Sequence, residues 1–144
     1  GTQEIFWDRD DVLYASVHVD PGAGWFPHIV GYADERGGGA GMGWTHNEPL
    51  LPGSGDAPWL AALDRLIDTV GRHRSSALVV SLGVDAAEHD PAAPLTVTAD
   101  GFGAAGERLA ALGLPTVFVQ EGGYDLDRLV ALVLAVLTGF EGAA

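Results

Sequence analysis

The sequence contains no cysteine, a single methionine and only seven lysine and arginine residues among its 144 positions. Without cysteine, a disulfide framework and a thiolate metal site are both excluded, and any metal ion must be held by histidine, aspartate or glutamate. The basic residues are scattered and the net charge is −13, whereas binding to nucleic-acid phosphates needs clustered lysine and arginine. A nucleic-acid partner is therefore not expected.

Long hydrophobic runs are also lacking. The most apolar stretch, Leu129 to Leu137, is far shorter than the roughly 20 residues that a membrane-spanning helix needs. The first residues, Gly1 to Glu4, show no basic leader followed by an apolar segment. We therefore expect no membrane partner and a cytoplasmic location.

The overall composition is typical of a folded domain. Hydrophobic residues make up 47% of the chain and charged residues 19%, a balance typical of one globular domain with a buried core. The acidic excess has two interpretations, which the sequence leaves open. It keeps the protein in solution, or it attracts a cationic small molecule such as a polyamine.

Hydrophobic periodicity predicts strands that alternate with helices. The predicted elements are a helical turn at 2–7, strands at 12–19 and 44–50, a helix at 57–73, a strand at 77–82, a helix between the N-cap Thr98 and the C-cap Gly113, a strand at 116–120 and a helix at 126–140. This alternation predicts an α/β fold with three layers, α/β/α, around a parallel sheet. The segment Thr45 to Glu48 is more polar than a strand in such a sheet is expected to be.

Two residues follow predicted strands directly and are candidates for chemistry. Asp85 comes after an apolar strand, where a carboxylate suits a metal ligand or a base; a turn or helix cap is the alternative. Tyr124 follows Gly122 and Gly123, which allow a tight turn and a close approach of the backbone to a ligand. The alternative for Tyr124 is packing over the edge of the sheet.

Other sequence patterns do not indicate a binding or catalytic site. The glycine-rich run at residues 37–43 has neither the glycine spacing nor the following lysine of a phosphate-binding loop. The five histidines show no paired spacing of metal ligands, and we expect His73 and His89 at the surface. Asp90, before Pro91, is interpreted as a structural turn.

Taken in order along the chain, three segments resemble a known family. They are GTQEIFWDRDDVLYASVHVDP, SLGVDAAEHDP and QEGGYDL, and they are similar to segments of zinc-dependent deacetylases of the histone deacetylase and acetylpolyamine amidohydrolase superfamily. The stretch WFPHIVGYADERGGGAGMGW resembles the acetylpolyamine amidohydrolases more than the histone-directed enzymes. The resemblance implies the arginase-deacetylase fold and hydrolysis of the acetyl amide of a small acetylated amine.

The resemblance also implies roles for individual residues. Asp85 is expected to be a zinc ligand, and Tyr124 to donate its hydroxyl to the carbonyl oxygen of the substrate. The residues implied at the substrate are Phe26, as a wall of the acyl tunnel, and the backbone of Gly122 and Gly123. Two structural monovalent-cation sites, for potassium, are implied at Ser16 and Val17 (inner) and at the carbonyls of Phe6, Arg9, Val12 and Trp44 (outer).

The chain departs from the family pattern in one large respect. The Asp-x-His zinc ligands and the His-His proton-transfer pair of the family have no counterpart in it, and catalytic zinc takes three protein ligands and a water. We therefore expect residues 1–144 to be the C-terminal part of a single deacetylase domain, with an incomplete sheet and no activity alone. The alternatives are a non-catalytic relic or interaction module of the same fold, and an unrelated α/β small-molecule binder. The substrate (an acetylpolyamine, another small acetyl amide or an acetyl-lysine protein) and the oligomeric state stay open.

Overall fold

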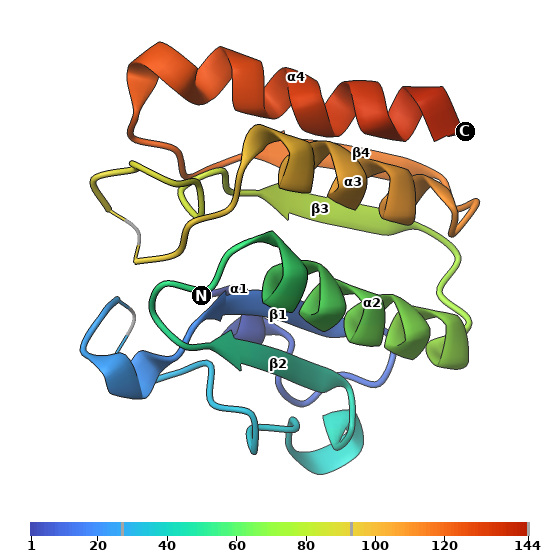
Figure 1. The fold of residues 1–144 in the computed structure, drawn as a ribbon. Coiled ribbons are helices and arrows are strands. Elements are labelled where there is room, and N and C mark those ends of the chain that lie inside the picture. Colours follow the sequence, from blue (N-terminus) through green and yellow to red (C-terminus); the bar gives the residue numbers. More distant parts are fainter. Residues whose placement is uncertain (27, 93, 144) are drawn as a thin grey trace.

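A computed structural model describes residues 1–26, 28–92 and 94–143. Strands and helices follow one another as the periodicity predicts (Figure 1). The elements are α1 (Thr2–Ile5), β1 (Tyr14–Val19), β2 (Thr45–Leu50), α2 (Asp56–His73), β3 (Leu78–Leu82), α3 (Ala99–Ala110), β4 (Thr116–Gln120) and α4 (Leu126–Ala143), with short 3-10 turns at Pro21–Ala23 and Gly39–Gly41. No helix in the described ranges is both long enough and apolar enough to cross a membrane.

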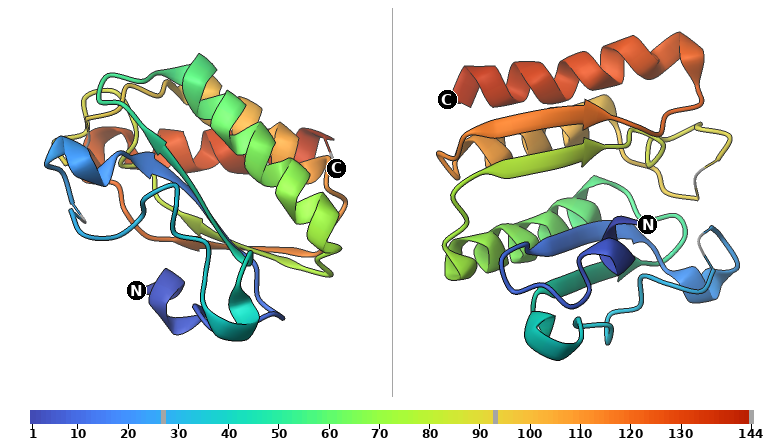
Figure 2. Two further views of the ribbon diagram at one scale, coloured as in Figure 1. Left: turned by 90° about the horizontal axis from the view of Figure 1, so that it is seen from below. Right: turned by 180° about the vertical axis from the view of Figure 1, so that it is seen from behind.

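The strands form two parallel pairs. β1 pairs with β2, with Tyr14 opposite Thr45, and β3 pairs with β4, with Leu78 opposite Thr116. Within the described residues no strand pairing joins one pair to the other. Figure 2 shows α2, α3 and α4 on one side of the strands and α1 on the other. The predicted α/β class with parallel strands is confirmed.

One hydrophobic core, on the side of α2, α3 and α4, spans both strand pairs. It includes Val19 and Leu50 from the first pair, Leu82 from the second, and Trp59 and Phe102 from the helices. The rings of Trp59 and Phe102 meet edge to face, with centroids 5.3 Å apart. Burial of such side chains stabilises a fold by roughly 1.5–3 kcal/mol each. The helices, rather than strand pairing, therefore hold the two pairs together.

Helices α3 and α4 are packed with their backbones close together. A Cβ atom at Gly106 would meet the carbonyl oxygen of Val136, and one at Gly139 would meet the carbonyl oxygen of Gly103. Glycine permits this approach because it has no side chain. The glycine content of these two helices is therefore a packing feature.

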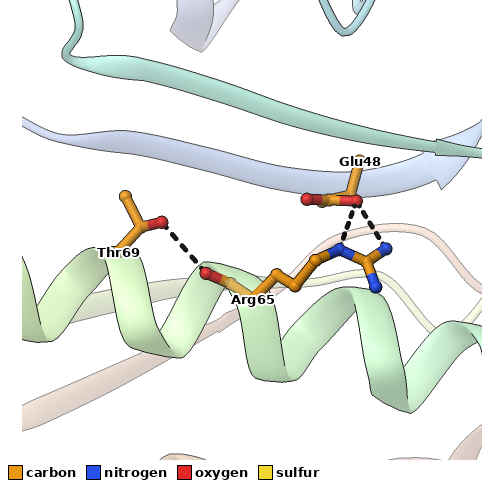
Figure 3. Close-up of polar contacts among 3 residues, drawn as sticks. All are labelled: Glu48, Arg65 and Thr69. Atoms are coloured by element: carbon orange, nitrogen blue, oxygen red, sulfur yellow. Dashed lines mark hydrogen bonds and ion pairs between the residues drawn. The ribbon is translucent and has the colours of Figure 1, made fainter.

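The polar segment Thr45 to Glu48 is a strand after all, because its two faces meet different partners. On the face toward α2, Glu48 accepts from Arg65 at 2.6 Å (Figure 3), and the His46 ring lies 5.7 Å from that of His73. On the opposite face Asn47 is buried and donates to the Gln3 side chain of α1 at 2.9 Å. His73, expected at the surface, is partly buried and meets Trp44 edge to face at 4.8 Å, whereas His89 is exposed as predicted.

Candidate functional site

Asp85 lies where β3 ends, against the turn that follows β4. The Val84 N–H donates to the Gly122 carbonyl at 2.9 Å, which joins the two turns. A Cβ atom at Gly122 would lie 2.5 Å from Oδ2 of Asp85, so only glycine leaves room for the carboxylate there. Burial raises the pKa of the Asp85 carboxyl, and the negative charges of Asp90 and Glu121 add to this effect. A nearby cation would compensate such a carboxylate.

The turn after β4 presents Tyr124. Gly123 has φ 143°, in the region that favours glycine, and a Cβ atom there would meet Val84 and Leu129 at 2.6 and 2.8 Å. The Tyr124 side chain is 58% exposed. Tyr124 therefore lies in the turn beyond the carboxyl end of β4, and Asp85 lies beyond the carboxyl end of the neighbouring strand β3.

A third carboxylate, Asp90, fastens this turn to the loop after β3. Asp90 is 6% exposed, and its Oδ2 accepts from the backbone N–H of Tyr124 at 2.7 Å and of Asp125 at 3.2 Å. Its Oδ1 accepts from the N–H of Ala92 at 2.8 Å. The sequence correctly predicts a turn at Asp90. No sequence signal indicates that its side chain accepts hydrogen bonds from the distant N–H groups of Tyr124 and Asp125.

The described residues do not complete a zinc site. They contain no group of three or more histidine, aspartate and glutamate side chains that would hold a metal ion, whereas catalytic zinc takes three protein ligands. Asp90, one of the two carboxylates whose charges act on Asp85, already accepts hydrogen bonds from three backbone N–H groups. The described chain thus offers Asp85 as one candidate ligand.

Phe26 lies exposed in the loop that follows β1. The carboxyl ends of β1, β3 and β4 are at the same end of the molecule (Figure 1), so this loop and the two turns share one end of the strands. Ligands of α/β sheets bind at that end. The role of Phe26 in a substrate tunnel stays a prediction.

The residues predicted for structural cations lie on the segments around β1 and β2. Ser16 Oγ is 2.8 Å from Nδ1 of His18, and Val17 is the next residue of β1. At the other end of the strands, the Phe6 carbonyl accepts from the Arg9 N–H at 3.1 Å and the Trp44 carbonyl from the Tyr14 N–H at 2.9 Å. A carbonyl oxygen has a second lone pair for a cation. Cation binding there, with Val12 as a further carbonyl, stays a prediction.

Comparison with known proteins gives consistent results. Residues 1–140 match the histone deacetylase domain family. The chain is 49% identical, over 144 residues, to acetylpolyamine amidohydrolase 1 of Pseudomonas aeruginosa, covering 100% of this chain and 41% of that protein. It is 37% identical to a histone deacetylase-like amidohydrolase of the same organism, and the match covers 99% of this chain and 38% of that protein.

A solved structure shows the same arrangement of elements. The crystal structure of the acetylpolyamine aminohydrolase from Burkholderia pseudomallei superposes with a TM-score of 0.96 at 43% identity, covering 99% of this chain and 42% of that one. The chain thus spans about two fifths of the length of these relatives.

Proposed function

Because the chain belongs to the histone deacetylase domain family, we propose that residues 1–144 form the C-terminal part of a single zinc-dependent deacetylase domain. The proposed reaction adds water to the carbonyl carbon of an acetyl amide and breaks its C–N bond, which yields acetate and the free amine. The remaining metal ligands and the proton-transfer groups would come from polypeptide outside these 144 residues. The chain alone would be inactive.

The observation that carries the proposal is the junction of two distant turns. The segments that carry Asp85 and Tyr124 are joined by the hydrogen bond from the Val84 N–H to the Gly122 carbonyl and by the bond from the Tyr124 N–H to Asp90. In the proposed role, Asp85 supplies a carboxylate to the metal. The Tyr124 hydroxyl donates a hydrogen bond to the substrate carbonyl oxygen as negative charge develops on it.

We propose a small acetylated amine in the cytoplasm, of the acetylpolyamine type, as the substrate. The support is the higher identity to an acetylpolyamine amidohydrolase, 49%, than to a histone deacetylase-like amidohydrolase, 37%. The net charge of −13 would also favour the approach of a cationic substrate. Turnover of N-acetylputrescine should exceed that of an acetyl-lysine peptide, and the reverse ranking would contradict this assignment.

The test of the function joins this chain to the remaining part of the Pseudomonas aeruginosa relative and measures deacetylation with zinc present. Tyr124→Phe should lower kcat by about 100-fold or more, because one donor to the developing oxyanion is lost. Tyr32→Phe is the matched control, since it also removes an exposed phenol, whose hydroxyl donates to the His28 carbonyl. Equal activity of both variants would contradict the proposed role.

One observation favours a second candidate, a non-catalytic interaction module of the same fold. It is the lack of a group of three metal-ligating side chains among the described residues. The joined protein distinguishes the two candidates. A module would show no turnover of N-acetylputrescine and no zinc binding beyond that of an Asp85→Asn variant, whereas the proposed enzyme would show both.

A further inference from the structure

One backbone unit in the loop after β1 is held by side chains on both sides. We call residues 20–26 and 28–31, which follow β1, the β1 loop. Its last residue, Gly31, is buried, and the Gly31 N–H donates to Oε2 of Glu35 at 2.7 Å. The Gly31 carbonyl accepts from Nε2 of His18, on β1, at 2.8 Å. We call these two bonds the Gly31 clamp.

Gly31 is confined by shape as well as by hydrogen bonds. It has φ 104°, in the region that favours glycine. A Cβ atom there would lie 2.5 Å from Nε2 of His18. The other ring nitrogen of His18, Nδ1, is 2.8 Å from Oγ of Ser16, and this contact orients the ring. The ring therefore occupies the space that any side chain at position 31 would need.

Glu35 ties the end of the β1 loop to the rest of the chain. Its Oε2 also accepts from the Gln3 side chain of α1 at 2.7 Å and from the Tyr32 N–H at 3.2 Å. Gln3 is buried, and its Oε1 accepts from the buried side chain of Asn47, on β2, at 2.9 Å. Hydrogen bonds to an ionised carboxylate are stronger than those between neutral groups. Glu35 therefore fixes the loop to α1 directly and to β2 through Gln3.

The β1 loop carries large apolar side chains that stay exposed. Trp25, Phe26 and Ile29 are 40%, 85% and 85% exposed. They bury little surface in this chain, so their own hydrophobic burial contributes little to the position of the loop. Polar anchors hold it at both ends: the Asp20 N–H donates to the Leu50 carbonyl at 2.7 Å at the start, and the Gly31 clamp lies at the end.

The place of the β1 loop suits contact with a substrate. It follows the carboxyl end of β1, and the turns with Asp85 and Tyr124 follow the carboxyl ends of β3 and β4 (Figure 1). Exposed apolar side chains on a loop that is already ordered can bind an aliphatic group at a small cost in conformational entropy. A small acetylated amine has such a group between its acetyl amide and its free amine.

We infer that Glu35 and His18 are positioning residues for substrate binding. They fix Gly31 and thereby the loop that presents Trp25, Phe26 and Ile29 to the aliphatic part of the substrate. Neither Glu35 nor His18 needs to touch the substrate. The clamp sets the affinity for the substrate and leaves the chemical step to other residues. This inference rests on the proposed function, because it concerns the same substrate.

The test uses this chain joined to the remaining part of the Pseudomonas aeruginosa relative and measures the kinetics of N-acetylputrescine hydrolysis with zinc present. Glu35→Ala should raise KM about tenfold and change kcat less than about twofold, because the loop contacts the substrate equally in the ground state and the transition state. Asp34→Ala is the matched control. It removes the same charge from the exposed neighbouring residue, so it measures any effect of charge alone on a cationic substrate. Glu35→Gln keeps an acceptor oxygen of the same reach and should keep KM near the original value.

Gly31→Ala tests the clamp from the side of His18. The added methyl group would collide with the His18 ring, so KM should again rise about tenfold as the loop moves. Gly113→Ala is the matched control, because Gly113 also has a positive φ, 64°, but a Cβ atom there meets nothing within 4 Å. It introduces similar backbone strain before the start of β4, outside the β1 loop, and should keep KM.

Amide hydrogen exchange measures the clamp without catalysis. The N–H groups of Gly31 and Tyr32 should exchange slowly in the unaltered joined protein and at least about tenfold faster in Glu35→Ala. Asp34→Ala should leave both rates unchanged. If Glu35→Ala fails to fold, the exchange rates of the unaltered protein and the KM of Gly31→Ala decide.

Three results would overturn the inference. They are equal KM values for Glu35→Ala and Asp34→Ala, a fall in kcat without a rise in KM, and fast exchange at Gly31 in the unaltered protein. Failure of the proposed function is a separate result, namely no turnover by the unaltered joined protein. In that case the dissociation constant of N-acetylputrescine, measured by titration calorimetry on the same variants, takes the place of KM. Equal dissociation constants for the two variants would then contradict the clamp as well.

Discussion

Asp90 shows how a single residue can hold two parts of the candidate site together. Its buried carboxylate accepts three backbone N–H groups, from Ala92, Tyr124 and Asp125. Asp90→Ala should lower the free energy of unfolding by about 2–3 kcal/mol, because buried donors lose a charged acceptor. Glu88→Ala, at an exposed neighbour, is the control and should have little effect in the same urea titration. Equal effects of the two changes would rule out this role.

His46 makes the stability of the chain depend on pH. Burial lowers the pKa of its imidazole below the ordinary value of 6.5, the positive charges of Arg36, His73 and Arg72 act in the same direction, and a hydrogen bond with the Gly43 carbonyl opposes them. The unfolded chain therefore binds the proton more readily. The contribution of His46 to the free energy of unfolding is therefore fully present above pH 6.5. It is lost as the pH falls from 6.5 through the lowered pKa of the folded state.

The His46→Gln variant tests this dependence. Free energies of unfolding at about pH 7.5 and about pH 5 should differ less for His46→Gln than for the unaltered chain. His89→Asn is the control, because asparagine tolerates the left-handed backbone at this exposed position (φ 73°). It should keep the original difference, and an unchanged difference in His46→Gln would contradict the assignment.

For single residues of the candidate site, the sequence predicts the place in the chain of strands and turns better than it predicts the contacts that each residue makes. Asp85 and Tyr124 follow β3 and β4 as predicted, because an apolar run followed by a turn is a local pattern. The bonds between the two turns, and the use of Asp90 to make them, join residues about 35 positions apart. No local pattern encodes that distance. The chemical roles of Asp85, Tyr124 and Phe26 remain predictions.

Among the elements, the contact between α3 and α4 depends most on residue size. Gly106→Ala should lower the free energy of unfolding by about 1–3 kcal/mol, because the added methyl group would press on the Val136 carbonyl, which is backbone and cannot turn away. Gly71→Ala in α2 is the control, since a Cβ atom there meets nothing within 4 Å. It should raise stability by about 0.5–1 kcal/mol. Thermal unfolding that ranks the two variants the other way would contradict this packing.

Most elements could be predicted from periodicity. The helix expected at 57–73 is Asp56–His73, and the strand expected at 116–120 is Thr116–Gln120. The division of the strands into two pairs could not be predicted, because a hydrophobic pattern marks a strand without naming its neighbour. The polar strand β2 looked anomalous for a related reason: its polar side chains meet Gln3 and Arg65, which lie far away in the sequence.

The whole molecule combines a net charge of −13 with uncovered apolar faces. Charge repulsion keeps such a protein dispersed. Light scattering of the chain alone should therefore rise as the pH falls toward the isoelectric point of about 4.4. The double variant Val117→Thr and Val119→Thr should reduce this rise, whereas Met42→Thr, a control outside the sheet, should not. Equal scattering of all three proteins would show that the uncovered face of β3 and β4 plays no part.

Pro49 also determines how an assembly of strands based on this molecule can grow. A β-fibre lengthens when each incoming molecule pairs a strand with the exposed edge of the last one. The edge of β2 hinders this pairing, because Pro49 has no N–H to donate. We therefore expect a ribbon of strands built from this chain to elongate poorly from an end at which β2 is the outermost strand.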